Sequence, residues 1–328
     1  MRYVPLLILL ASQFVLAAET RQAARLLAVR KIWDRAPHNA FTDLVRYKDE
    51  WYCTFREGAA HVSPDGKLRI ISSADGKAWE SAALVSMHLR DLRDPKLCMT
   101  PHGEVMLVAA AAPPAAGGKY QTYAWFSKDL RTWSEPSKIG EEDFWLWRVA
   151  WHDGRAYSIG YGCKPGIEFV RLYASDDGRT FRPIVSKLLE PGYPSESALV
   201  FLPSDTALCL LRRDARGQSS AQLGEATPPY TQWTFHDLGM QLGGPSAIRL
   251  PDGRLVAAGR VSTPREHTGL CWLNAAPPSL EEFLPLPSGG DTSYPGLVWH
   301  DSRLWVSYYS SHEGRTAIYL AEIALPSK

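Results

Sequence analysis

The chain has 328 residues, 45% of them hydrophobic, and its 36 basic and 35 acidic side chains leave a formal net charge of +1. This balance gives no indication of a nucleic-acid or anionic-membrane partner, and the apolar content is sufficient for a buried core. The 24 Pro, 25 Gly, 12 Trp and 14 Tyr favour many short strands and turns over long helices.

The first segment of the chain has the pattern of a secretion signal. Arg2 precedes an apolar run from Val4 to Leu16, and Val15-Leu16-Ala17 offers small or apolar residues at the cleavage positions. The run is too short for a comfortable bilayer span. We therefore expect residues 1–18 to be removed, no membrane span afterwards, and a secreted or periplasmic protein whose residues 19–328 form a single domain.

The remainder is organised as a repeat. An extended segment, Ala28–Trp33, is followed by six β-rich units at approximately 38–82, 92–136, 145–183, 193–236, 243–284 and 291–325. Their first strands carry functional residues at intervals of 51, 54, 48, 49 and 49, namely Asp43, Asp94, Arg148, Glu196, Pro245 and Tyr294. Such a period predicts an all-β, six-bladed propeller with four-stranded antiparallel blades, closed by Ala28–Trp33 as an outer strand.

A second element recurs later in three of the units. Ser72–Trp79, Ser127–Trp133 and Ala174–Phe181 follow the Ser-x-Asp-x-Gly-x-Thr-Trp pattern of the Asp-box hairpin, with Ala74 taken as the residue at the main Asp position of the first copy. In this turn Ser and Asp accept hydrogen bonds from backbone donors while the aromatic residue packs under the blade. We predict a structural role for all three.

The five cysteines are too dispersed for a disulfide scaffold. Cys53 and Cys209 lie in hydrophobic runs and are predicted to be buried in strands. A disulfide between two blades stays possible.

Asp-boxes on a secreted six-bladed propeller resemble the sialidase (neuraminidase) superfamily, and the resemblance covers nearly the whole mature chain. It implies a retaining glycoside hydrolase with a Tyr nucleophile, an activating Glu, an Asp acid/base and an Arg triad that holds the substrate carboxylate. A Tyr suits a substrate that is already negative, because a carboxylate nucleophile would be repelled. The implied substrate is a sialylated or related nonulosonic glycan.

The resemblance extends to individual residues. Tyr294 corresponds to the nucleophile and Glu196 to its activator, each at the start of a blade. An Arg is expected after that Glu, where Arg212 and Arg213 both stand, and Arg213 is favoured because Arg213-Asp214 aligns with Arg56-Glu57 in the first blade. Arg260 corresponds to the next Arg.

The expected acid/base lies in the loop before the first Asp-box, here His61-Val62-Ser63-Pro64-Asp65-Gly66. Asp65 is the candidate for this role. Pro64-Asp65-Gly66 is equally well explained as a turn like Pro251-Asp252-Gly253. His61 could act instead of Asp65 or beside it, since imidazole titrates near neutral pH.

The first blade departs from the family pattern. Sialidases have Arg-Ile-Pro there, with the first Arg of the triad, whereas this chain has Phe41-Thr42-Asp43-Leu44. An Asp would repel a substrate carboxylate unless a cation neutralised it. The missing guanidinium could come from Arg56, Arg93 or Arg148, and its planar fork suits carboxylate binding.

Two other functions are compatible with the pattern. Leu92-Arg93-Asp94-Pro95 resembles the Arg-Asp-Pro segment of five-bladed propeller glycosidases that act on neutral sugars, in which case Asp43, Asp94 and Glu196 would do the chemistry. A non-catalytic glycan-binding propeller would instead stack sugars on aromatic side chains, for which the candidates are Trp145, Trp147, Trp151 and Tyr161. Contact between Tyr294 and Glu196 would weigh against the binding protein.

Motifs for metals and cofactors are missing from the sequence. The nine His include no His-Glu-x-x-His or other paired-ligand spacing, and no Gly-rich loop follows a strand and opens a helix. We therefore expect neither metal nor cofactor, and a glycan as the partner.

Overall fold

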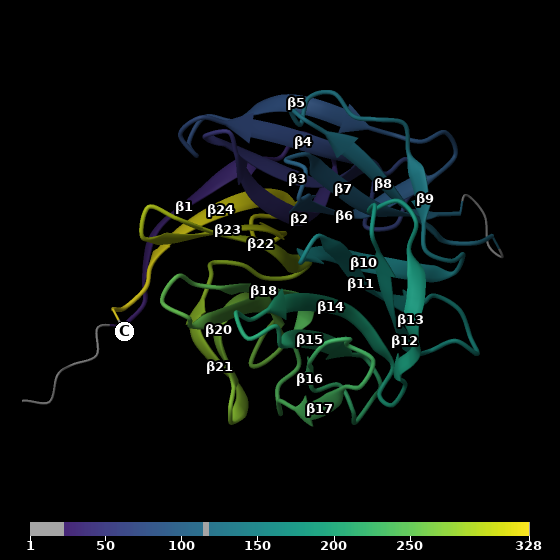
Figure 1. Cartoon of the computed structure of the whole chain (residues 1–328). Coiled ribbons are helices and arrows are strands. Elements are labelled where there is room, and N and C mark those ends of the chain that lie inside the picture. Colours follow the sequence, from purple (N-terminus) through teal and green to yellow (C-terminus); the bar gives the residue numbers. More distant parts are fainter. Residues whose placement is uncertain (1–22, 114–117, 328) are drawn as a thin grey trace, which may run out of the picture.

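The computed structural model describes residues 23–113 and 118–327, so the predicted signal at residues 1–18 lies outside the described residues. Within the described ranges every regular element is a β-strand, and the strands form six four-stranded antiparallel sheets (Figure 1). The predicted all-β, six-bladed propeller is confirmed. In these same ranges no helix has the length and apolarity needed to cross a membrane.

The blades follow one another along the chain, each from its inner to its outer strand. The first three contain β2 (His38–Tyr47), β3 (Glu50–Gly58), β4 (Lys67–Ser73) and β5 (Glu80–Val85); β6 (Asp91–Met99), β7 (Val105–Ala112), β8 (Gln121–Ser127) and β9 (Ser137–Ile139); and β10 (Phe144–His152), β11 (Arg155–Gly162), β12 (Val170–Ser175) and β13 (Arg182–Leu189). The next two contain β14 (Pro194–Phe201), β15 (Ala207–Arg213), β16 (Gln222–Ala226) and β17 (Thr234–Asp237); and β18 (Gly243–Arg249), β19 (Leu255–Val261), β20 (His267–Ala275) and β21 (Pro278–Pro285).

The sixth blade joins the two ends of the chain. It consists of β22 (Thr292–His300), β23 (Arg303–Ser310), β24 (Ala317–Ala324) and, as its outer strand, β1 (Arg25–Trp33). β1 pairs antiparallel with β24, with Arg25 opposite Ala324, as predicted for the segment Ala28–Trp33. β22 also packs against β2, which closes the ring of inner strands around the centre of Figure 1.

The core lies between neighbouring blades rather than in one central mass. β7 (Val-Met-Leu-Val-Ala-Ala-Ala-Ala) is buried along its whole length, because a middle strand of a blade is covered on both faces. Leu107 and Trp125 of the second blade pack in one cluster with Tyr52 and Leu68 of the first. Burial of both faces replaces the simple alternation of polar and apolar residues found in half-exposed sheets.

The three Asp-boxes form the predicted hairpin turns. In the first, Asp75 accepts hydrogen bonds from the backbone N–H groups of Lys77 and Ala78 at 2.8 and 3.0 Å, while Ser73 Oγ accepts one from Gly76 N at 2.9 Å. Asp129 and Asp177 accept the same pair of backbone hydrogen bonds. Ser127 Oγ accepts from Leu130 N as Ser73 does from Gly76 N, whereas Ser175 Oγ accepts from Asp177 N. The placement of Ala74 at the main Asp position was wrong by one residue, since Asp75 fills that position.

The cysteines form no disulfide. All five lie within the described residues and are free, and Cys53 and Cys209 are buried in β3 and β15 as predicted. The suggested bridge between two blades is thereby ruled out for this structure.

Every inner strand has a β-bulge close to its first residues. In each case two residues stand opposite one position of the next strand, and the bulged pairs are Phe41-Thr42, Asp94-Pro95, Trp147-Arg148, Ser195-Glu196, Gly244-Pro245 and Tyr294-Pro295. This register corrects the alignment of the repeat, because Phe41 rather than Asp43 is the first-blade counterpart of Asp94 and Tyr294.

The bulges are locally strained. The φ angles of Phe41, Asp94 and Tyr294 are +63°, +52° and +51°, in a region that bulky side chains rarely occupy. Such conformations cost about 1–3 kcal/mol each and concentrate at functional sites.

We call the face of the propeller where the inner strands begin the mouth. Because the strands of a blade alternate in direction, the Asp-boxes after β4, β8 and β12 lie on the opposite face.

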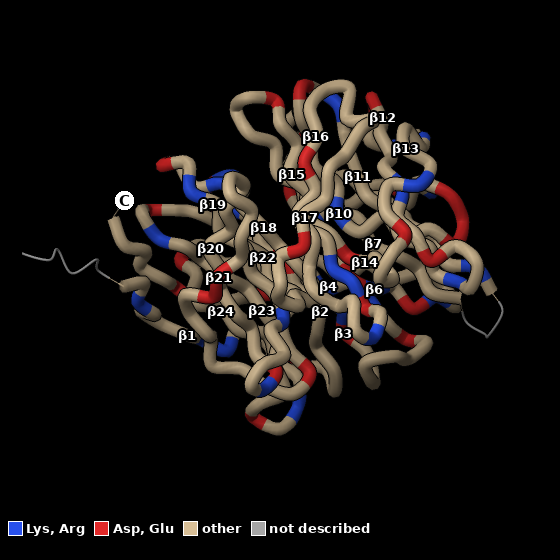
Figure 2. Tube along the Cα trace, turned by 90° about the horizontal axis from the view of Figure 1, so that it is seen from below, with Lys and Arg blue, Asp and Glu red and all other residues tan. Residues whose placement is uncertain are grey.

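Charged residues are distributed over the whole described part of the molecule. Figure 2 shows Lys and Arg intermixed with Asp and Glu along the trace, in keeping with the net charge of +1. A functional site therefore has to be sought in local clusters rather than in a field of one sign.

Candidate active site

Tyr294, Glu196 and Arg212 form a hydrogen-bonded cluster at the mouth. The Tyr294 hydroxyl donates to Glu196 Oε1 at 2.7 Å. Arg212 Nη1 donates to Glu196 Oε2 at 2.6 Å and to Tyr294 Oη at 3.0 Å. The bulges in β14 and β22 bring these residues together although 98 positions separate Glu196 from Tyr294. The contact that would weigh against a purely glycan-binding protein is present.

The cluster holds an ionised Glu beside a neutral Tyr. Burial alone would raise the pKa of Glu196, but the charge of Arg212 and hydrogen bonds from Tyr294, Arg212 and Gly244 hold it below its usual range. Burial, together with the Glu196 charge, raises the pKa of Tyr294 well above 10. Tyr294 therefore needs a base to become a nucleophile, and Glu196 is positioned to be that base.

Gly244 is a further member of the cluster that sequence reasoning passed over in favour of Pro245. Its N–H donates to Glu196 Oε2 at 2.7 Å. A Cβ at this position would lie 2.7 Å from Cγ of Tyr294, and φ is +59°. Only glycine allows both the conformation and the close approach of the Tyr294 ring. In the sequence, the run Gly243-Gly244-Pro245 was the feature that could have indicated this role of Gly244.

Arg212, rather than Arg213, reaches Tyr294. Successive side chains of a strand leave opposite faces, so the two arginines of β15 diverge. Arg213 donates to Ser220 O at 2.8 Å and to Asp237 Oδ2 at 2.5 Å. The preference for Arg213 was therefore wrong. Arg213 and Arg56 do occupy equivalent positions in their blades, as predicted. At this position, however, each arginine hydrogen-bonds to a loop of its own blade instead of facing Tyr294.

Two arginines at the mouth donate no hydrogen bond to a described residue. Arg260 lies over the Tyr294 ring, with Cζ 5.8 Å from the centroid, and Arg93 lies 5.3 Å over Phe41. The rings of Phe41 and Tyr294 are themselves 5.2 Å apart. Arg93 Nε is buried without a hydrogen-bond partner. Asp91 lies 3.9 Å from Arg93 Nη1 and Asp94 lies 4.0 Å from Arg93 Nε, and both distances are too long for hydrogen bonds.

The other two arginines considered as replacements for the missing guanidinium are engaged. Arg56 is fully buried and donates to Asp91 at 2.7 Å and to carbonyl and hydroxyl oxygens of the loop 59–66. Arg148 donates to both oxygens of Asp43 at 3.1 Å and to Pro295 O. Asp43 also accepts from Leu97 N at 2.8 Å, so this carboxylate joins three blades and is not open to a sugar.

Asp94 and Lys96 are buried ionisable groups beside the cluster. Burial raises the pKa of Asp94 to about 6, against the opposing charges of Arg93 and Lys96. Burial likewise lowers the pKa of Lys96 to about 8. Asp94 Oδ1 has no hydrogen-bond partner among the described residues, and Lys96 Nζ lies 5.0 Å from the Trp147 ring centroid. Such groups exchange protons near neutral pH.

His61 and Asp65, the two acid/base candidates in the loop 59–66, are placed differently. His61 packs edge-on against Phe41, with ring centroids 5.1 Å apart, and its Nδ1 lies 2.7 Å from Asp291 Oδ2. Asp65 instead accepts from Ala59 N at 3.2 Å, and hydrogen bonds from Ser63 and Ala59 lower its pKa. This geometry matches the turn interpretation of Pro64-Asp65-Gly66.

Asp291 was not recognised in the sequence, because its partners are far away along the chain. It lies 2.9 Å from His38 Nε2 and accepts from the Tyr309 hydroxyl at 2.7 Å. Burial would raise the pKa of Asp291, but the hydrogen bonds from His38, His61 and Tyr309 hold it far below its usual range. The loop Gly289-Gly290-Asp291 directly before Tyr294 was the only local signal.

Two side-chain groups have the atoms to hold a metal ion. Within the described part of the chain these are His38, His61 and Asp291 near the mouth, and His152, Asp153 and Asp205 at the far ends of the strands, each with ligand atoms within 4.8 Å of one another. The separations within each group are those of ordinary hydrogen bonds and ion pairs.

The aromatic candidates for sugar stacking are mostly packed within the protein. Trp147 is 1% exposed and lies 5.7 Å from Tyr294, and Trp145 is stacked between Tyr120 and Tyr161. Trp151 belongs to the core between the second and third blades. Trp147 contacts both Tyr161 of this stack and Tyr294, so it connects the stacked rings to the cluster at the mouth.

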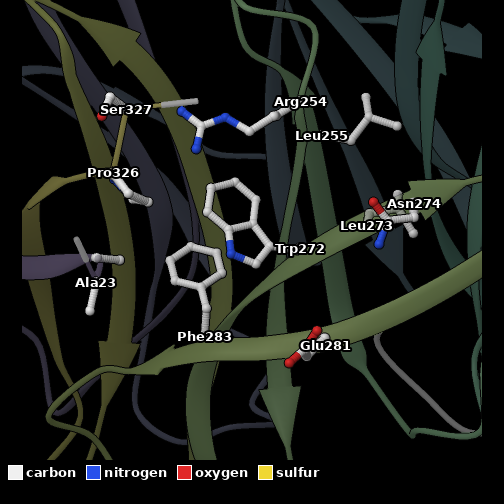
Figure 3. Close-up of a pocket in the computed structure, with 11 residues that line it drawn as sticks. Ala23, Arg254, Leu255, Trp272, Leu273, Asn274, Glu281, Phe283, Pro326 and Ser327 are labelled. Carbon is white, nitrogen blue, oxygen red and sulfur yellow. The ribbon is translucent and has the colours of Figure 1, made fainter. Parts of the chain in front are cut away.

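A well-formed pocket lies elsewhere, on the side of the fifth blade (Figure 3). Its volume is about 430 Å³, and it is lined by Trp272, Phe283, Arg254 and Glu281, with Ala23 from just before β1 and Pro326 from just after β24. Trp272 and Phe283 stack 4.4 Å apart beneath Arg254. None of its lining residues belongs to the Tyr294 cluster, so this pocket is separate from the candidate active site.

The comparisons with known proteins extend to fold only. No protein-family model matches the chain, and no curated protein matches its sequence. A protein of unknown function from Dyadobacter fermentans has a TM-score of 0.78 and 20% identity, over 92% of this chain and 99% of that chain.

Two structurally similar glycosidases are of different kinds. The α-L-arabinofuranosidase Arb93A from Fusarium graminearum has a TM-score of 0.72 and 13% identity over 90% of this chain and 97% of that chain. The Trypanosoma rangeli sialidase, solved with the inhibitor DANA, has a TM-score of 0.69 and 11% identity, and the match covers 88% of this chain but 55% of the sialidase. The chain is thus a six-bladed β-propeller of glycoside hydrolase-like fold, structurally similar at low identity to sialidases and to arabinose-active glycosidases.

Proposed function

We propose that this protein is a retaining exo-glycosidase that cleaves a terminal anionic sugar, of the sialic or related nonulosonic acid class, from glycans. The observation that carries the proposal is the 2.7 Å hydrogen bond from Tyr294 to an ionised Glu196. A buried phenol paired with a carboxylate base is a nucleophile arrangement, and it suits an anomeric centre that bears a negative substituent.

The cations around Tyr294 support an anionic substrate. Arg212 is engaged with Glu196, whereas Arg93 and Arg260 have donors that no described residue accepts from. Arg93 supplies the guanidinium that the first blade lacks, because it lies over the Phe41 ring. Arginine donors left open in a buried site favour a carboxylate, which can accept two parallel hydrogen bonds.

In the proposed reaction, Glu196 takes the phenolic proton while Tyr294 Oη attacks the anomeric carbon, and the aglycone oxygen leaves with a proton. Water then displaces Tyr294 from the same carbon, and two inversions give net retention. We further propose that the protein acts outside the cytoplasm, as the N-terminal segment predicts.

A second candidate function rests on Asp94. Its pKa is raised to about 6 while that of Glu196 is lowered, and two carboxyl groups with separated pKa values are the usual acid and base of a glycosidase. In this alternative the pair acts on neutral sugars, as the similarity to an arabinofuranosidase suggests. Asp43 is omitted, since Arg148 and Leu97 N occupy its oxygens.

One experiment separates the two functions. The purified protein is assayed on 4-nitrophenyl α-sialoside and on a panel of neutral 4-nitrophenyl glycosides that includes α-L-arabinofuranoside, beside Tyr294→Phe and Asp94→Asn. Sialoside cleavage lost in Tyr294→Phe supports the anionic-sugar enzyme. Cleavage of neutral glycosides only, retained in Tyr294→Phe and lost in Asp94→Asn, would replace it by the carboxylate pair.

A further inference from the structure

We propose that His61, supported by Asp291, is the group that exchanges a proton with the leaving-group oxygen when Tyr294 attacks the sugar. The inference rests on the proposed function, which leaves the source of that proton open. It assigns the acid/base role to an imidazole where the family resemblance placed the carboxylate of Asp65.

The placement of His61 is the first support. Its side chain is 47% exposed and packs against the Phe41 ring, which also contacts Tyr294, so Phe41 is a direct neighbour of both residues. Its Nδ1 is bound to Asp291, whereas no described residue hydrogen-bonds to Nε2. One ring nitrogen is therefore held by Asp291, and the other is left without a hydrogen-bond partner among the described residues.

The protonation of His61 Nδ1 follows from its partner. The pKa of Asp291 is held far below its usual range, so this carboxyl is ionised, and because a carboxylate can only accept hydrogen bonds, Tyr309, His38 and His61 must all donate to it. Nδ1 of His61 must then carry its hydrogen permanently, which leaves Nε2 as the atom that gains and loses a proton.

The same three residues are poorly arranged for a metal. In a neutral His38 whose Nε2 donates to Asp291, Nδ1 carries no hydrogen, which suits its position because this atom is buried with no partner among the described residues. A metal on Nε2 would force a hydrogen onto Nδ1 with no acceptor, although metal-binding histidines usually donate their second N–H to an acceptor. A buried unpaired donor costs about 1–3 kcal/mol. The three residues are therefore better suited to hydrogen bonding between the histidines and Asp291 than to holding a metal ion.

Asp65 is poorly suited to donate a proton to the substrate. Its carboxylate closes the loop that carries His61 by accepting from Ala59 N, and its lowered pKa keeps it ionised at neutral pH. Asp94 is the rival proton donor, because its pKa is raised. It is 5% exposed, and it lies close enough to His61 for the charge of that residue to influence its pKa. Asp65 is therefore a positioning residue, and Asp94 is the alternative to be tested.

The reaction balances with these groups alone. Tyr294 Oη forms a bond to the anomeric carbon as the glycosidic C–O bond breaks; Glu196 takes the phenolic proton, and the imidazolium of His61 gives its Nε2 proton to the departing alcohol. Neutral His61 then removes a proton from water, whose oxygen displaces Tyr294, and Glu196 returns the proton to the phenolate. The products are the free sugar and the alcohol.

Leaving-group dependence tests this role, since a good leaving group needs no proton. We expect His61→Ala to cleave 4-nitrophenyl α-sialoside within about 10-fold of the wild type but to lose about 10²–10⁴-fold in kcat on an alkyl α-sialoside. Added imidazole should restore part of the alkyl activity. His152→Ala is the matched control, because it removes a histidine paired with Asp205 at the far end of β10, and it should affect both substrates equally.

Three outcomes would overturn the inference. Equal losses on both substrates without imidazole rescue would make His61 structural. A leaving-group dependence in Asp94→Asn instead of His61→Ala would transfer the role to Asp94. Activity that is abolished by chelation and restored by Zn²⁺ would make His38, His61 and Asp291 a metal site. A wild type inactive on every glycoside would refute the proposed function itself, a result distinct from these three.

Discussion

The two sides of the mouth differ in how completely their polar groups are paired. On the side of the fourth to sixth blades, Glu196 accepts hydrogen bonds from Tyr294, Arg212 and Gly244 N, although Arg260 beside them donates none to a described residue. On the side of the second blade, Arg93 Nε and Asp94 Oδ1 are buried without a partner among the described residues. Paired groups are held in position before a substrate arrives, whereas unpaired groups gain free energy when it supplies the missing partner.

This comparison predicts large kinetic effects on the paired side. Tyr294→Phe removes the nucleophile but retains the ring between Phe41 and Trp147. We expect kcat to fall by at least ~10³-fold, as for the removal of other catalytic nucleophiles, without loss of folding. Steady-state kinetics and a thermal melt measure both properties. A variant with wild-type kcat would show that the Tyr294–Glu196 pair is structural.

The neighbouring arginines of β15 sharpen the comparison within a single strand. Arg212→Met should lower kcat/KM about 10²-fold, because it removes a charged donor to both Glu196 and Tyr294. Arg213→Met is the control, since it breaks the ion pair with Asp237 and should reduce stability while changing kcat/KM far less. The reverse ranking would restore Arg213 as the substrate-binding residue.

On the unpaired side, the expected change is in substrate affinity. Arg93→Met keeps an unbranched side chain over Phe41 and should raise KM for the sialoside about 10–100-fold, with a smaller change in kcat, because hydrogen bonds to charged groups contribute about 1.5–3 kcal/mol. Arg46→Met, at a cation–π contact near the opposite end of β2, is the control. Unchanged KM in Arg93→Met would place the sugar carboxylate elsewhere, with Arg260 next to be tested.

The last expected effect is on stability rather than on kinetics, and it is a gain in stability from Asp94→Asn. Since the pKa of Asp94 is raised to about 6 in the folded state, the folded protein holds this proton longer than the unfolded chain. The free energy of unfolding therefore falls as pH rises from about 4 to 6, by up to about 3 kcal/mol. Asparagine tolerates the φ of +52° and removes this cost.

Urea unfolding at pH 4 and pH 8 measures the effect. Asp94→Asn should be more stable than the wild type at pH 8 and about equal to it at pH 4. Asp75→Asn is a control of opposite sign, because hydrogen bonds lower the pKa of Asp75, so its carboxylate contributes stability that is lost as pH falls. Equal behaviour of the two variants would mean that Asp94 is hydrated rather than desolvated.

Much of the fold could be predicted from the sequence. The period of about fifty residues, the three Asp-boxes and the extended segment Ala28–Trp33 each follow from local patterning, and together they were sufficient for a six-bladed ring closed by β1. The position of Ala74 and the alignment of Asp43 were each wrong, by one and two residues, because a bulge or turn shifts the register by steps too small for a repeat to reveal.

The candidate site, however, could be predicted only in part from the sequence. Tyr294 and Glu196 were named because each opens a blade, and the structure places them 2.7 Å apart. The choice between Arg212 and Arg213, by contrast, depends on which face of β15 each side chain leaves, and Asp291 has significance only through His38 and His61, which lie 253 and 230 positions away. No local pattern encodes such pairings.

The sequence by itself determined the architecture, because blade repeats, turns and a closing strand are short-range features of composition and spacing. The tertiary structure alone decided which ionisable groups are paired, which are left open and which are buried. Those properties arise where six bulged strands meet at one axis, and there burial and neighbouring charges, rather than residue type, determine the pKa values of Glu196, Tyr294 and Asp94.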